Sequence, residues 1–514
     1  MELTICGVDP RTGETLEPQF REATPEQVER AVELAAEASS SLRALTAEQA
    51  AQFLNSIRDE IAALGDSLVE LADRETALGV ERLKGERERT LNQLKLFADL
   101  VTEGSWVDAR IDTALPDRKP LPRADIRRML QPVGPVAVFG ASNFPLAFSV
   151  AGGDTASAFA ARNPVVVKAH PAHPGTSELV ATAIARAVKT NRLPEGTFSM
   201  LHGRSPSASI SLVNHPKLKA VGFTGSLRAG RALFDAAAKR PQPIPVYAEM
   251  GSVNPVFVLP QTVNANADGI ADGLFRSVTL GVGQFCTSPG LVFGVKDQSL
   301  DRFQSKLIAN FEQSSPASML NAAIAKGYAE RFKEFRSIDA VKTYAAQKQA
   351  SAKSTEGAPG LFVVDAEAWE QSEALREEIF GPATVLVRCE TEEEMLEAAR
   401  TLEGSLTATI HGSPEELQRN QKLIDLLTQK AGRLIFNGYP TGVEVGYAMH
   451  HGGPYPSTTD EKFTSVGTTA IYRFARPICY QNFPDTALPP ELQNANPRQI
   501  WRTINGKLTR EAIA

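Results

Sequence analysis

The sequence has 514 residues, with 42% hydrophobic residues, 22% charged residues and a formal net charge of −6. This composition is typical of a soluble globular protein, and the length exceeds what one hydrophobic core supports, so two or three domains are expected. An acidic balance without a dense block of Lys and Arg argues against nucleic acid as the main partner. No apolar run reaches the roughly 18 residues of a membrane span, and the N-terminus lacks the regions of a secretory signal.

The cysteines indicate the redox setting. There are four of them, Cys6, Cys286, Cys389 and Cys479, and they form no CxxC pair. This scattered pattern fits a reduced, cytoplasmic protein. None of the seven histidines falls near a cysteine at the spacing of metal ligands, so the sequence predicts no metal site.

The first part of the chain predicts helices, and the part after it predicts a sheet. Residues 24–65 have the apolar spacing of two amphipathic helices with threonine capping signals, and residues 85–101 predict a third helix. A polar connection follows at 110–122. From 127 to 251 strands and helices alternate four times, which is the signature of a parallel sheet with crossover helices. Such sheets bind ligands at the carboxyl ends of their strands.

A second alternating region is predicted between residues 256 and 437, and it indicates another α/β domain. Residues 447–468 are rich in Gly, Pro, Ser and Thr and predict a long loop. The tail after them has little periodicity and is expected to lie against another part of the protein or another subunit.

Several side chains follow predicted strands, and each of them alone has an ordinary structural interpretation. Lys168 is either a solvated strand end, which the strand alone favours, or a ligand for ribose hydroxyls or phosphate. Gly225 and Gly230 surround the start of a helix, where a pyrophosphate can bind, although glycine turns are common. Asn143 is either a turn asparagine or an amide donor to an oxyanion.

Glu249 and Cys286 are the candidates for reactive groups. A carboxylate at the end of an apolar strand should be partly desolvated, which would raise the pKa of Glu249 and suit a general base. The alternative is a helix-capping or ion-paired glutamate. Cys286 lies in "LGVGQFCTSPG". It is either a buried structural cysteine or a nucleophile, and a nucleophile needs a lowered pKa or an adjacent base.

The order of these residues is more specific than any one of them. One ordered set runs along the chain: Asn143, Lys168, Gly225-Ser226, Glu249, Cys286 and "EEIFGP" at 377–382. In this set the chain resembles the aldehyde dehydrogenase superfamily, from about residue 20 to about residue 485. The segments "GQFC" and "EEIFGP" are the most specific. The resemblance implies an α/β fold with a Rossmann-type cofactor domain, an α/β catalytic domain and a small oligomerisation element.

The resemblance implies catalytic roles for three residues. Cys286 would attack the aldehyde carbon, and Asn143 would hold the oxyanion together with the cysteine's own N–H. Hydride transfer would leave a thioester, and Glu249 would activate the water that hydrolyses it. A thiolate, an amide donor and a desolvated carboxylate are the groups that covalent aldehyde oxidation needs.

The resemblance also implies a nicotinamide cofactor. Lys168 would bind the adenosine ribose, Ser226 the pyrophosphate and Glu378 the nicotinamide ribose, with Phe380 beside the nicotinamide. The full set of predicted cofactor contacts is Lys168, Ser142, His170, Arg204, Gly225, Ser226, Gly230, Gly251, Glu378 and Phe380.

The cofactor preference is predicted from the segment after Lys168. Position 171 is a proline, so no carboxylate stands where one commonly favours NAD. Arg204 follows the next strand and could pair with a 2′-phosphate. The sequence therefore favours NADP and leaves NAD open as a second acceptor.

Within the superfamily, the segments "GVGQFCTSPG", "HHGGPYPSTTDEKFTSVGTTAI" and "RPICYQNFP" are similar to dehydrogenases of 2-oxoglutarate semialdehyde (2,5-dioxopentanoate). An NADP-dependent fatty aldehyde dehydrogenase is the close alternative. A dicarboxylic semialdehyde needs a cation in the pocket, and Arg276 and Arg89 are candidates, although the sequence alone favours a surface or helix–helix ion pair for each. An acylating dehydrogenase, against which Glu249 argues, and a non-catalytic relative are the two remaining hypotheses.

The resemblance implies three structural parts. The cofactor domain is predicted at 1–119 and 134–250, the catalytic domain at 251–469, and the oligomerisation element at 120–133 and 470–514. Dimers or tetramers are typical of the family, so a homodimer or homotetramer acting on a small aldehyde is expected.

Overall fold

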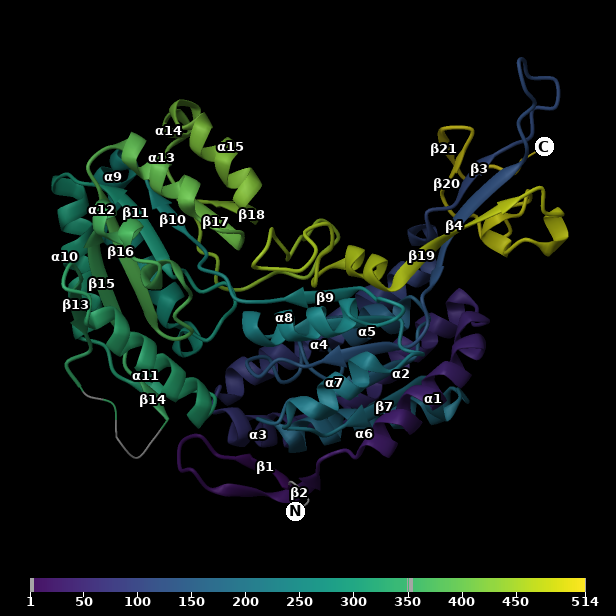
Figure 1. The fold of residues 1–514 in the computed structure, drawn as a ribbon, viewed down its shortest axis with the longest axis horizontal. Helices are drawn as coiled ribbons and strands as arrows, with labels where there is room; N and C mark the ends of the chain where they lie inside the picture. The colour runs from purple at the N-terminus through teal and green to yellow at the C-terminus, as the bar shows by residue number, and fades with distance from the viewer. Residues whose placement is uncertain (1–3, 349, 351–354, 514) are drawn as a thin grey trace.

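The computed structural model describes residues 4–348, 350 and 355–513. Figure 1 shows two large lobes, with a thin arm of strands extending from one of them. Each lobe contains its own sheet, so the predicted α/β class with two sheet-based units is confirmed. None of the helices in the described part of the chain is long and apolar enough to cross a membrane.

The first lobe is built on a parallel five-stranded sheet in the order β7-β6-β5-β8-β9. The strands are short apolar runs that are buried on both faces, as a sheet covered by helices requires. The strands are β5 (Val136–Phe139), β6 (Val165–Lys168), β7 (Phe198–Leu201), β8 (Ala220–Thr224) and β9 (Val246–Glu249). The crossover helices are α5 (Gly153–Ala160), α6 (Pro174–Thr190), α7 (Pro206–Asn214) and α8 (Leu227–Ala238).

Four N-terminal helices pack around this sheet after a hairpin. The hairpin is β1 (Thr4–Val8) and β2 (Thr15–Arg21), and the helices are α1 (Pro25–Arg43), α2 (Ala47–Ala62), α3 (Gly65–Thr76) and α4 (Val80–Glu103). Thr24 and Thr46 form capping boxes at the starts of α1 and α2, which confirms the two predicted helix starts. Helix α4 begins five residues before the predicted 85–101, and α3 was not predicted.

The second lobe contains a seven-stranded sheet in the order β13-β15-β16-β11-β10-β17-β18, in which only β13 is antiparallel to its neighbour. Its strands are β10 (Val256–Val258), β11 (Leu291–Val295), β13 (Lys342–Ala345), β15 (Gly360–Asp365), β16 (Ala383–Cys389), β17 (Ser405–His411) and β18 (Ala431–Phe436). Its helices are α9 (Pro260–Thr279), α10 (Gln298–Glu312), α11 (Ala322–Arg336), α12 (Ala366–Gln371), α13 (Glu392–Thr401), α14 (Pro414–Arg419) and α15 (Gln421–Lys430). A two-stranded pair, β12 (Ala317–Ser318) and β14 (Glu356–Gly357), lies outside the large sheet.

The arm is a third sheet, in the order β19-β4-β3-β20-β21. Its strands are β3 (Arg110–Asp112), β4 (Ile126–Pro132), β19 (Ala475–Gln481), β20 (Arg502–Ile504) and β21 (Lys507–Thr509). The predicted element at 120–133 and 470–514 covers four of these strands, whereas β3 lies before its predicted boundary. Short 3₁₀ turns occur at Ser105–Val107, Glu195–Thr197, Leu280–Gly283, Ala374–Arg376, Thr468–Phe474, Asp485–Ala487 and Pro490–Leu492.

Residues 437–467 form no helix or strand and pass from the second lobe to the first (Figure 1). The predicted loop at 447–468 is therefore confirmed. This crossing segment runs along the end of β9, where Met250 N donates to Ser457 O at 2.8 Å and Ala248 N donates to Thr459 Oγ1 at 2.9 Å. These bonds bring side chains from the segment to the carboxyl end of the first sheet.

Candidate active site

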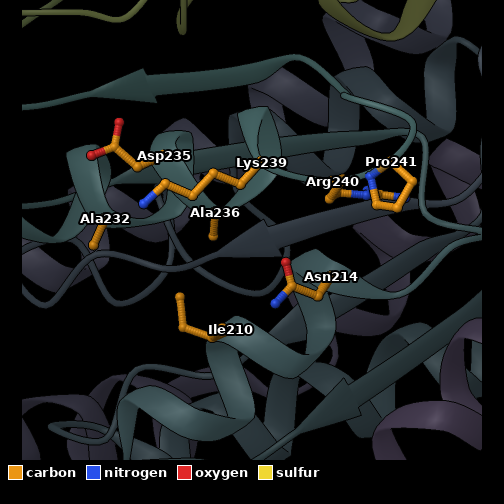
Figure 2. Close-up of a pocket in the computed structure, with 8 residues that line it drawn as sticks. All are labelled: Ile210, Asn214, Ala232, Asp235, Ala236, Lys239, Arg240 and Pro241. Carbon is orange, nitrogen blue, oxygen red and sulfur yellow. The ribbon is translucent and has the colours of Figure 1, made fainter.

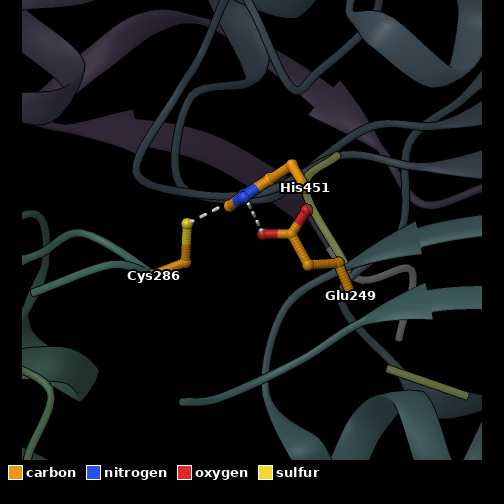
Figure 3. Close-up of side chains that lie close together, drawn as sticks. All are labelled: Glu249, Cys286 and His451. Carbon is orange, nitrogen blue, oxygen red and sulfur yellow. Dashed lines mark hydrogen bonds and ion pairs between the residues drawn. The ribbon is translucent and has the colours of Figure 1, made fainter. Parts of the chain in front are cut away.

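Glu249, Cys286 and His451 meet where the two lobes face each other. Cys286 Sγ lies 3.5 Å from His451 Nε2, and the same nitrogen lies 3.0 Å from Glu249 Oε1. Figure 3 shows the imidazole between the thiol and the carboxylate. The three groups come from the loop before β11, the end of β9 and the crossing segment. The predicted nucleophile and the predicted base are therefore both in contact with one imidazole.

The loop that carries Cys286 has an unusual backbone. Gly281, Val282 and Gly283 all have positive φ angles, of 56°, 58° and 66°. A Cβ on Gly283 would overlap the backbone at Gly381, so only glycine fits there. The buried Asn254 amide then donates to Cys286 O at 2.8 Å and to Ser288 O at 3.0 Å. These features hold the backbone of the loop that carries the thiol.

The carboxylate of Glu249 is buried, and its pKa lies below the ordinary value. Burial alone would raise this pKa, but His451 and the hydroxyl of Ser465, which donates a short hydrogen bond to Oε2, outweigh it. The thiol of Cys286 acts in the same direction. The predicted rise in the pKa of Glu249 is therefore wrong, because the neighbouring donors stabilise the charged form more than burial destabilises it.

The thiol of Cys286 has a pKa well above its ordinary value. Burial is the largest cause, and the negative charges of Glu249 and Glu378 add to it, while Arg89 opposes it. A thiol in this environment is neutral at pH 7, so it needs a proton acceptor when it reacts. The carboxylate of Glu249 hydrogen-bonds with the thiol and is the neighbouring group that can accept its proton. His451 Nε2 contacts both groups, and its Nδ1 is buried without a partner among the described residues.

Asn143 lies in the loop after β5, next to the cysteine loop. Its buried side-chain Nδ2 donates to Gln284 O at 3.0 Å, two residues before Cys286, and its own carbonyl accepts from Arg82 Nη2 at 2.7 Å. The structure therefore brings the predicted amide to the loop that carries the thiol. Gln284 is tied down in turn, because its Oε1 accepts from Leu320 N at 2.9 Å.

Lys168 lies at the carboxyl end of β6 as predicted. Its pKa is lowered to about 8, because burial penalises the ammonium more than the nearby Glu22 carboxylate stabilises it. Glu22 itself accepts from Ser205 N at 2.8 Å and Arg204 N at 3.1 Å, at the start of α7. The side chain of Arg204 is exposed. A carboxylate thus stands beside Lys168 in space, although position 171 is a proline.

The turn between β8 and α8 has the predicted form of an open glycine turn. Gly225 and Ser226 are exposed, and Ser226 Oγ caps the helix by accepting from Ala229 N at 3.4 Å. Gly230 is buried against Met250, and a Cβ there would collide with its sulfur. The first turn of α8 therefore leaves backbone N–H groups facing solvent at the sheet edge, which suits a pyrophosphate.

Ser142 and His170 lie in the loops that follow β5 and β6. The ring of His170 stacks on His173 with centroids 5.5 Å apart, and its Nδ1 accepts from Ala172 N at 3.1 Å. Burial lowers the pKa of His170 well below its ordinary value, so the ring is neutral. In this structure the aromatic neighbour of His170 is thus His173.

Glu378 projects from "EEIFGP" to the end of β9. Its carboxylate lies against Gly251, where any Cβ would overlap it. Burial raises the pKa of Glu378 to about 7, and the Ser252 N–H is the group that opposes the rise. Phe380 follows in the same segment and is partly buried. A buried carboxylate with so few donors matches a site for hydroxyl groups of a ribose.

The two arginines proposed for a substrate carboxylate have different surroundings. Arg276 is exposed on the last turn of α9 and faces Asp272, so the structure does not place it in the site. Helix α9 ends at Thr279, and the chain turns before it reaches Cys286. Arg89 on α4 points to the site, where its charge acts on Cys286. Arg433 on β18 also interacts with Cys286 and was not predicted.

Four further residues were missed from the sequence: His451, Ser465 and Asn254 around the thiol, and Glu22 beside Lys168. Each acts across a long sequence separation, and no local spacing indicates it. The only available signal was the polar segment 447–468, which contains two of them. No histidine lies near Cys286 along the sequence, but His451 reaches it in space. The carboxylate oxygen of Glu249, the sulfur of Cys286 and the imidazole nitrogen of His451 all lie within 4.8 Å of one another.

A separate pocket of about 620 Å³ lies between α7 and α8 (Figure 2). It is lined by Ile210, Asn214, Ala232, Asp235, Ala236, Lys239, Arg240 and Pro241. Asn214 and Lys239 stand at the carboxyl ends of the two helices, whereas the predicted cofactor contacts Arg204 and Ser226 lie at the amino ends. None of the predicted site residues lines this pocket.

Known proteins are similar to this chain in sequence and in fold. The family model described as "Aldehyde dehydrogenase family" matches residues 3–474. The chain is 49% identical to alpha-ketoglutaric semialdehyde dehydrogenase 2 of Azospirillum brasilense over 98% of its own length and 96% of the relative. It is 46% identical to alpha-ketoglutaric semialdehyde dehydrogenase of Acinetobacter baylyi, over 95% of its own length and 93% of the relative.

Solved structures share the fold at lower sequence identity. Lactaldehyde dehydrogenase from Escherichia coli has a TM-score of 0.79 at 22% identity, covering 94% of this chain and 96% of that one. PnpE in complex with nicotinamide adenine dinucleotide has a TM-score of 0.78 at 22% identity, covering 93% and 94%. Together with the family match over most of its length, these similarities show that the chain belongs to the aldehyde dehydrogenase family.

Proposed function

We propose that this protein oxidises 2-oxoglutarate semialdehyde (2,5-dioxopentanoate) to 2-oxoglutarate by a hydrolytic route, with NADP as the preferred acceptor. One observation carries the substrate assignment: the relatives at 49% and 46% identity, aligned over nearly the whole chain, are both alpha-ketoglutaric semialdehyde dehydrogenases. The arrangement of Cys286, His451 and Glu249 supports the chemistry. The aldehyde carbon is the electrophile, and the product is the carboxylic acid.

The first step of the proposed mechanism uses the thiol. Cys286 Sγ attacks the aldehyde carbon, and its proton passes to the charged Glu249 carboxylate, which hydrogen-bonds with the thiol, and from there to solvent before the hydrolytic step. The Asn143 amide exchanges its bond to Gln284 O for the new oxyanion, with the N–H of Cys286 as second donor. Because Glu249 is hydrogen-bonded to the same nitrogen of His451, the imidazole keeps its orientation.

The second step hydrolyses the thioester on Cys286. Glu249 is charged at neutral pH because its donors lower its pKa, so it can accept a proton from an incoming water. Ser465 and His451 position its two oxygens. A carboxylate held beside the thioester favours water over a second thiol as acceptor, which supports the hydrolytic route against the acylating one.

The residues at the carboxyl edge of the first sheet fit a nicotinamide cofactor. Lys168 is a buried cation that a ribose or phosphate would stabilise, Glu378 is a buried carboxylate with few donors, and Gly251 leaves the space beside it. The bound cofactor supplies the hydride acceptor. The exposed Arg204 supports NADP, since a guanidinium there can pair with a 2′-phosphate.

The arm and the cysteines support two further proposals. The arm exposes Leu121, Trp501 and Leu508, which are 69%, 43% and 68% exposed, and this supports its role as an oligomerisation element in a homodimer or homotetramer. All four cysteines are free, which supports a reducing, cytoplasmic setting.

The substrate assignment is tested by kcat/KM with NADP for 2-oxoglutarate semialdehyde and for pentanal, which has the same chain length without a carboxylate. The proposal predicts a preference for the semialdehyde of about tenfold to a hundredfold or more, since each factor of ten corresponds to about 1.4 kcal/mol. Equal values, or a preference for aliphatic aldehydes that grows with chain length, would reassign the protein to fatty aldehydes.

A further inference from the structure

Arg89 presents one edge of its guanidinium without a partner. Its Nη1 donates to Val443 O at 2.6 Å, while Nε and Nη2 are buried and have no hydrogen-bond partner among the described residues. The N–H groups on Nε and Nη2 lie on the same side of the planar group, at the spacing of the two oxygens of a carboxylate. A buried cation with two unpaired donors is costly, and a bidentate anion would remove that cost.

This guanidinium lies two side chains from the reactive thiol. Its central carbon is 5.5 Å from the ring centroid of Phe148, and that ring is 6.4 Å from the imidazole of His451. His451 in turn contacts Cys286. The charges of Arg89 and Cys286 act on each other, since Arg89 opposes the rise in the pKa of the thiol. Phe148 and His451 therefore connect the guanidinium to the thiol.

Arg433, on β18 of the second lobe, contacts the same turn of the crossing segment as Arg89. Its Nη2 donates to Pro440 O at 2.9 Å and to Gly442 O at 3.3 Å, and its Nε is buried without a partner among the described residues. Arg89 holds the next carbonyl, that of Val443. The turn 440–443 is thus bound by a cation on each side, and both cations interact with the charge of Cys286.

The acidic residues near Arg89 do not occupy its free edge. Glu86 is on the same helix, but its Oε1 accepts from Leu146 N at 2.8 Å and Ala147 N at 3.0 Å. Burial raises its pKa, which weakens its negative charge. Glu444 follows the turn and is exposed. The free edge therefore remains open to a carboxylate that enters with the substrate.

We propose that Arg89 binds the terminal carboxylate of the substrate side-on, and that Arg433 positions the 440–443 turn and adds a second positive charge. This inference rests on the proposed function, because it assumes an aldehyde with a distant carboxylate. In 2-oxoglutarate semialdehyde the carboxylate carbon lies four bonds from the aldehyde carbon, about 5 Å in an extended chain. The site thus selects short dicarboxylic semialdehydes over aliphatic aldehydes.

The test measures kcat/KM for the semialdehyde and for pentanal in the parent enzyme and in Arg89→Gln, Arg89→Lys, Arg433→Gln and Arg276→Gln. Arg89→Gln is expected to lose at least about 30-fold toward the semialdehyde and less than about threefold toward pentanal. Arg89→Lys retains the positive charge but not the two adjacent N–H donors. It is expected to recover less than a tenth of the activity that Arg89→Gln loses toward the semialdehyde. Arg276→Gln, an exposed arginine on another helix, is the matched control and should leave both values unchanged.

A binding measurement separates recognition from catalysis. The product 2-oxoglutarate should slow alkylation of Cys286 by iodoacetamide in the parent and in Arg276→Gln, but not in Arg89→Gln. Without 2-oxoglutarate, Arg89→Gln should be alkylated more slowly than the parent, because Arg89 lowers the pKa of the thiol, and an unchanged unfolding temperature shows that the variant is folded. Equal losses toward both substrates, or undiminished protection by 2-oxoglutarate, would overturn the role of Arg89. A parent enzyme with no preference for the semialdehyde would instead overturn the proposed function itself.

Discussion

His451 Nε2 lies 3.0 Å from Glu249 Oε1, across 202 residues of sequence. The same nitrogen faces the thiol of Cys286, so one imidazole contacts both the proposed nucleophile and the proposed base (Figure 3). The contact exists because the crossing segment 437–467 runs along the end of β9. Because of this contact, the pKa of Glu249 depends on His451, a residue of the long crossing segment.

Replacing His451 by Phe should change the pH dependence of turnover. His451 lowers the pKa of Glu249, so its removal raises that pKa. A base with a higher pKa loses its charge at a higher pH, and the acid limb of kcat should move to higher pH. The measurement is a pH profile of kcat for the variant, the parent and His450→Phe, which removes the neighbouring, half-buried histidine. An acid limb that stays in place in His451→Phe would show that the imidazole does not support the base.

The reactivity of Cys286 should rise with pH throughout the range from 7 to 9. Burial and the charges of Glu249 and Glu378 raise the pKa of this thiol well above its ordinary value. Below its pKa the thiolate fraction grows about tenfold per pH unit. The rate of iodoacetamide labelling of Cys286 in the cofactor-free enzyme measures it, with Cys286→Ser reporting the background from the exposed Cys479. A plateau reached by pH 7 would contradict the raised pKa.

Cofactor choice should depend on Glu22 and Arg204. The carboxylate of Glu22 lies beside Lys168 and would repel a 2′-phosphate, whereas the exposed Arg204 would attract one. Glu22→Gln should therefore raise the ratio of kcat/KM for NADP over NAD, and Arg204→Ala should lower it by about tenfold. Arg228, exposed at the start of α8, gives a matched control as Arg228→Ala. An unchanged ratio in both variants would remove these residues from cofactor selection.

Cofactor binding should take up protons between pH 8 and pH 9. The pKa of Lys168 is about 8 in the free protein, so the side chain is partly neutral in this range. An anionic cofactor placed beside it stabilises the ammonium form and raises its pKa toward the ordinary value, which draws a fraction of a proton from solution. Calorimetric titration of NADP at pH 8.5 in two buffers of different ionisation enthalpy measures the uptake. Lys168→Met should show less uptake, and an equal value would contradict the assignment.

The local elements and the ordered site residues could be predicted from the sequence, because each rests on a nearby pattern. The capping threonines Thr24 and Thr46 marked two helices, and apolar runs marked the strands that end at Lys168 and Glu249. The first sheet then placed Asn143, Lys168 and Glu249 at one edge, whereas Cys286 reaches that edge from the loop before β11 of the second lobe. Parallel strands place their carboxyl ends on one edge, so the order along the chain determined which side chains meet.

The electrostatics of the site could not be predicted in the same way. The pKa of Glu249 falls although the strand pattern predicted a rise, because His451 and Ser465 come from a segment with no periodic structure. Arg276 is close to Cys286 along the chain, but the turn at Gly281–Gly283 separates them. Arg433 interacts with Cys286, and Glu22 with Lys168, although each pair is far apart in the sequence. A loop without a repeating pattern gives no sequence signal for what its side chains contact.

The most direct test of the proposed chemistry is the fate of the acyl group in Glu249→Gln. This variant keeps the size of the side chain but removes the base, so Cys286 should form its thioester once and fail to hydrolyse it. Mixing the variant with semialdehyde and NADP should give a burst of NADPH near one equivalent per site. Steady turnover should then be slower by about 10²- to 10⁴-fold, and intact-protein mass should show the acyl group on Cys286. Undiminished steady turnover, or no acyl group on Cys286, would contradict a covalent route completed by Glu249.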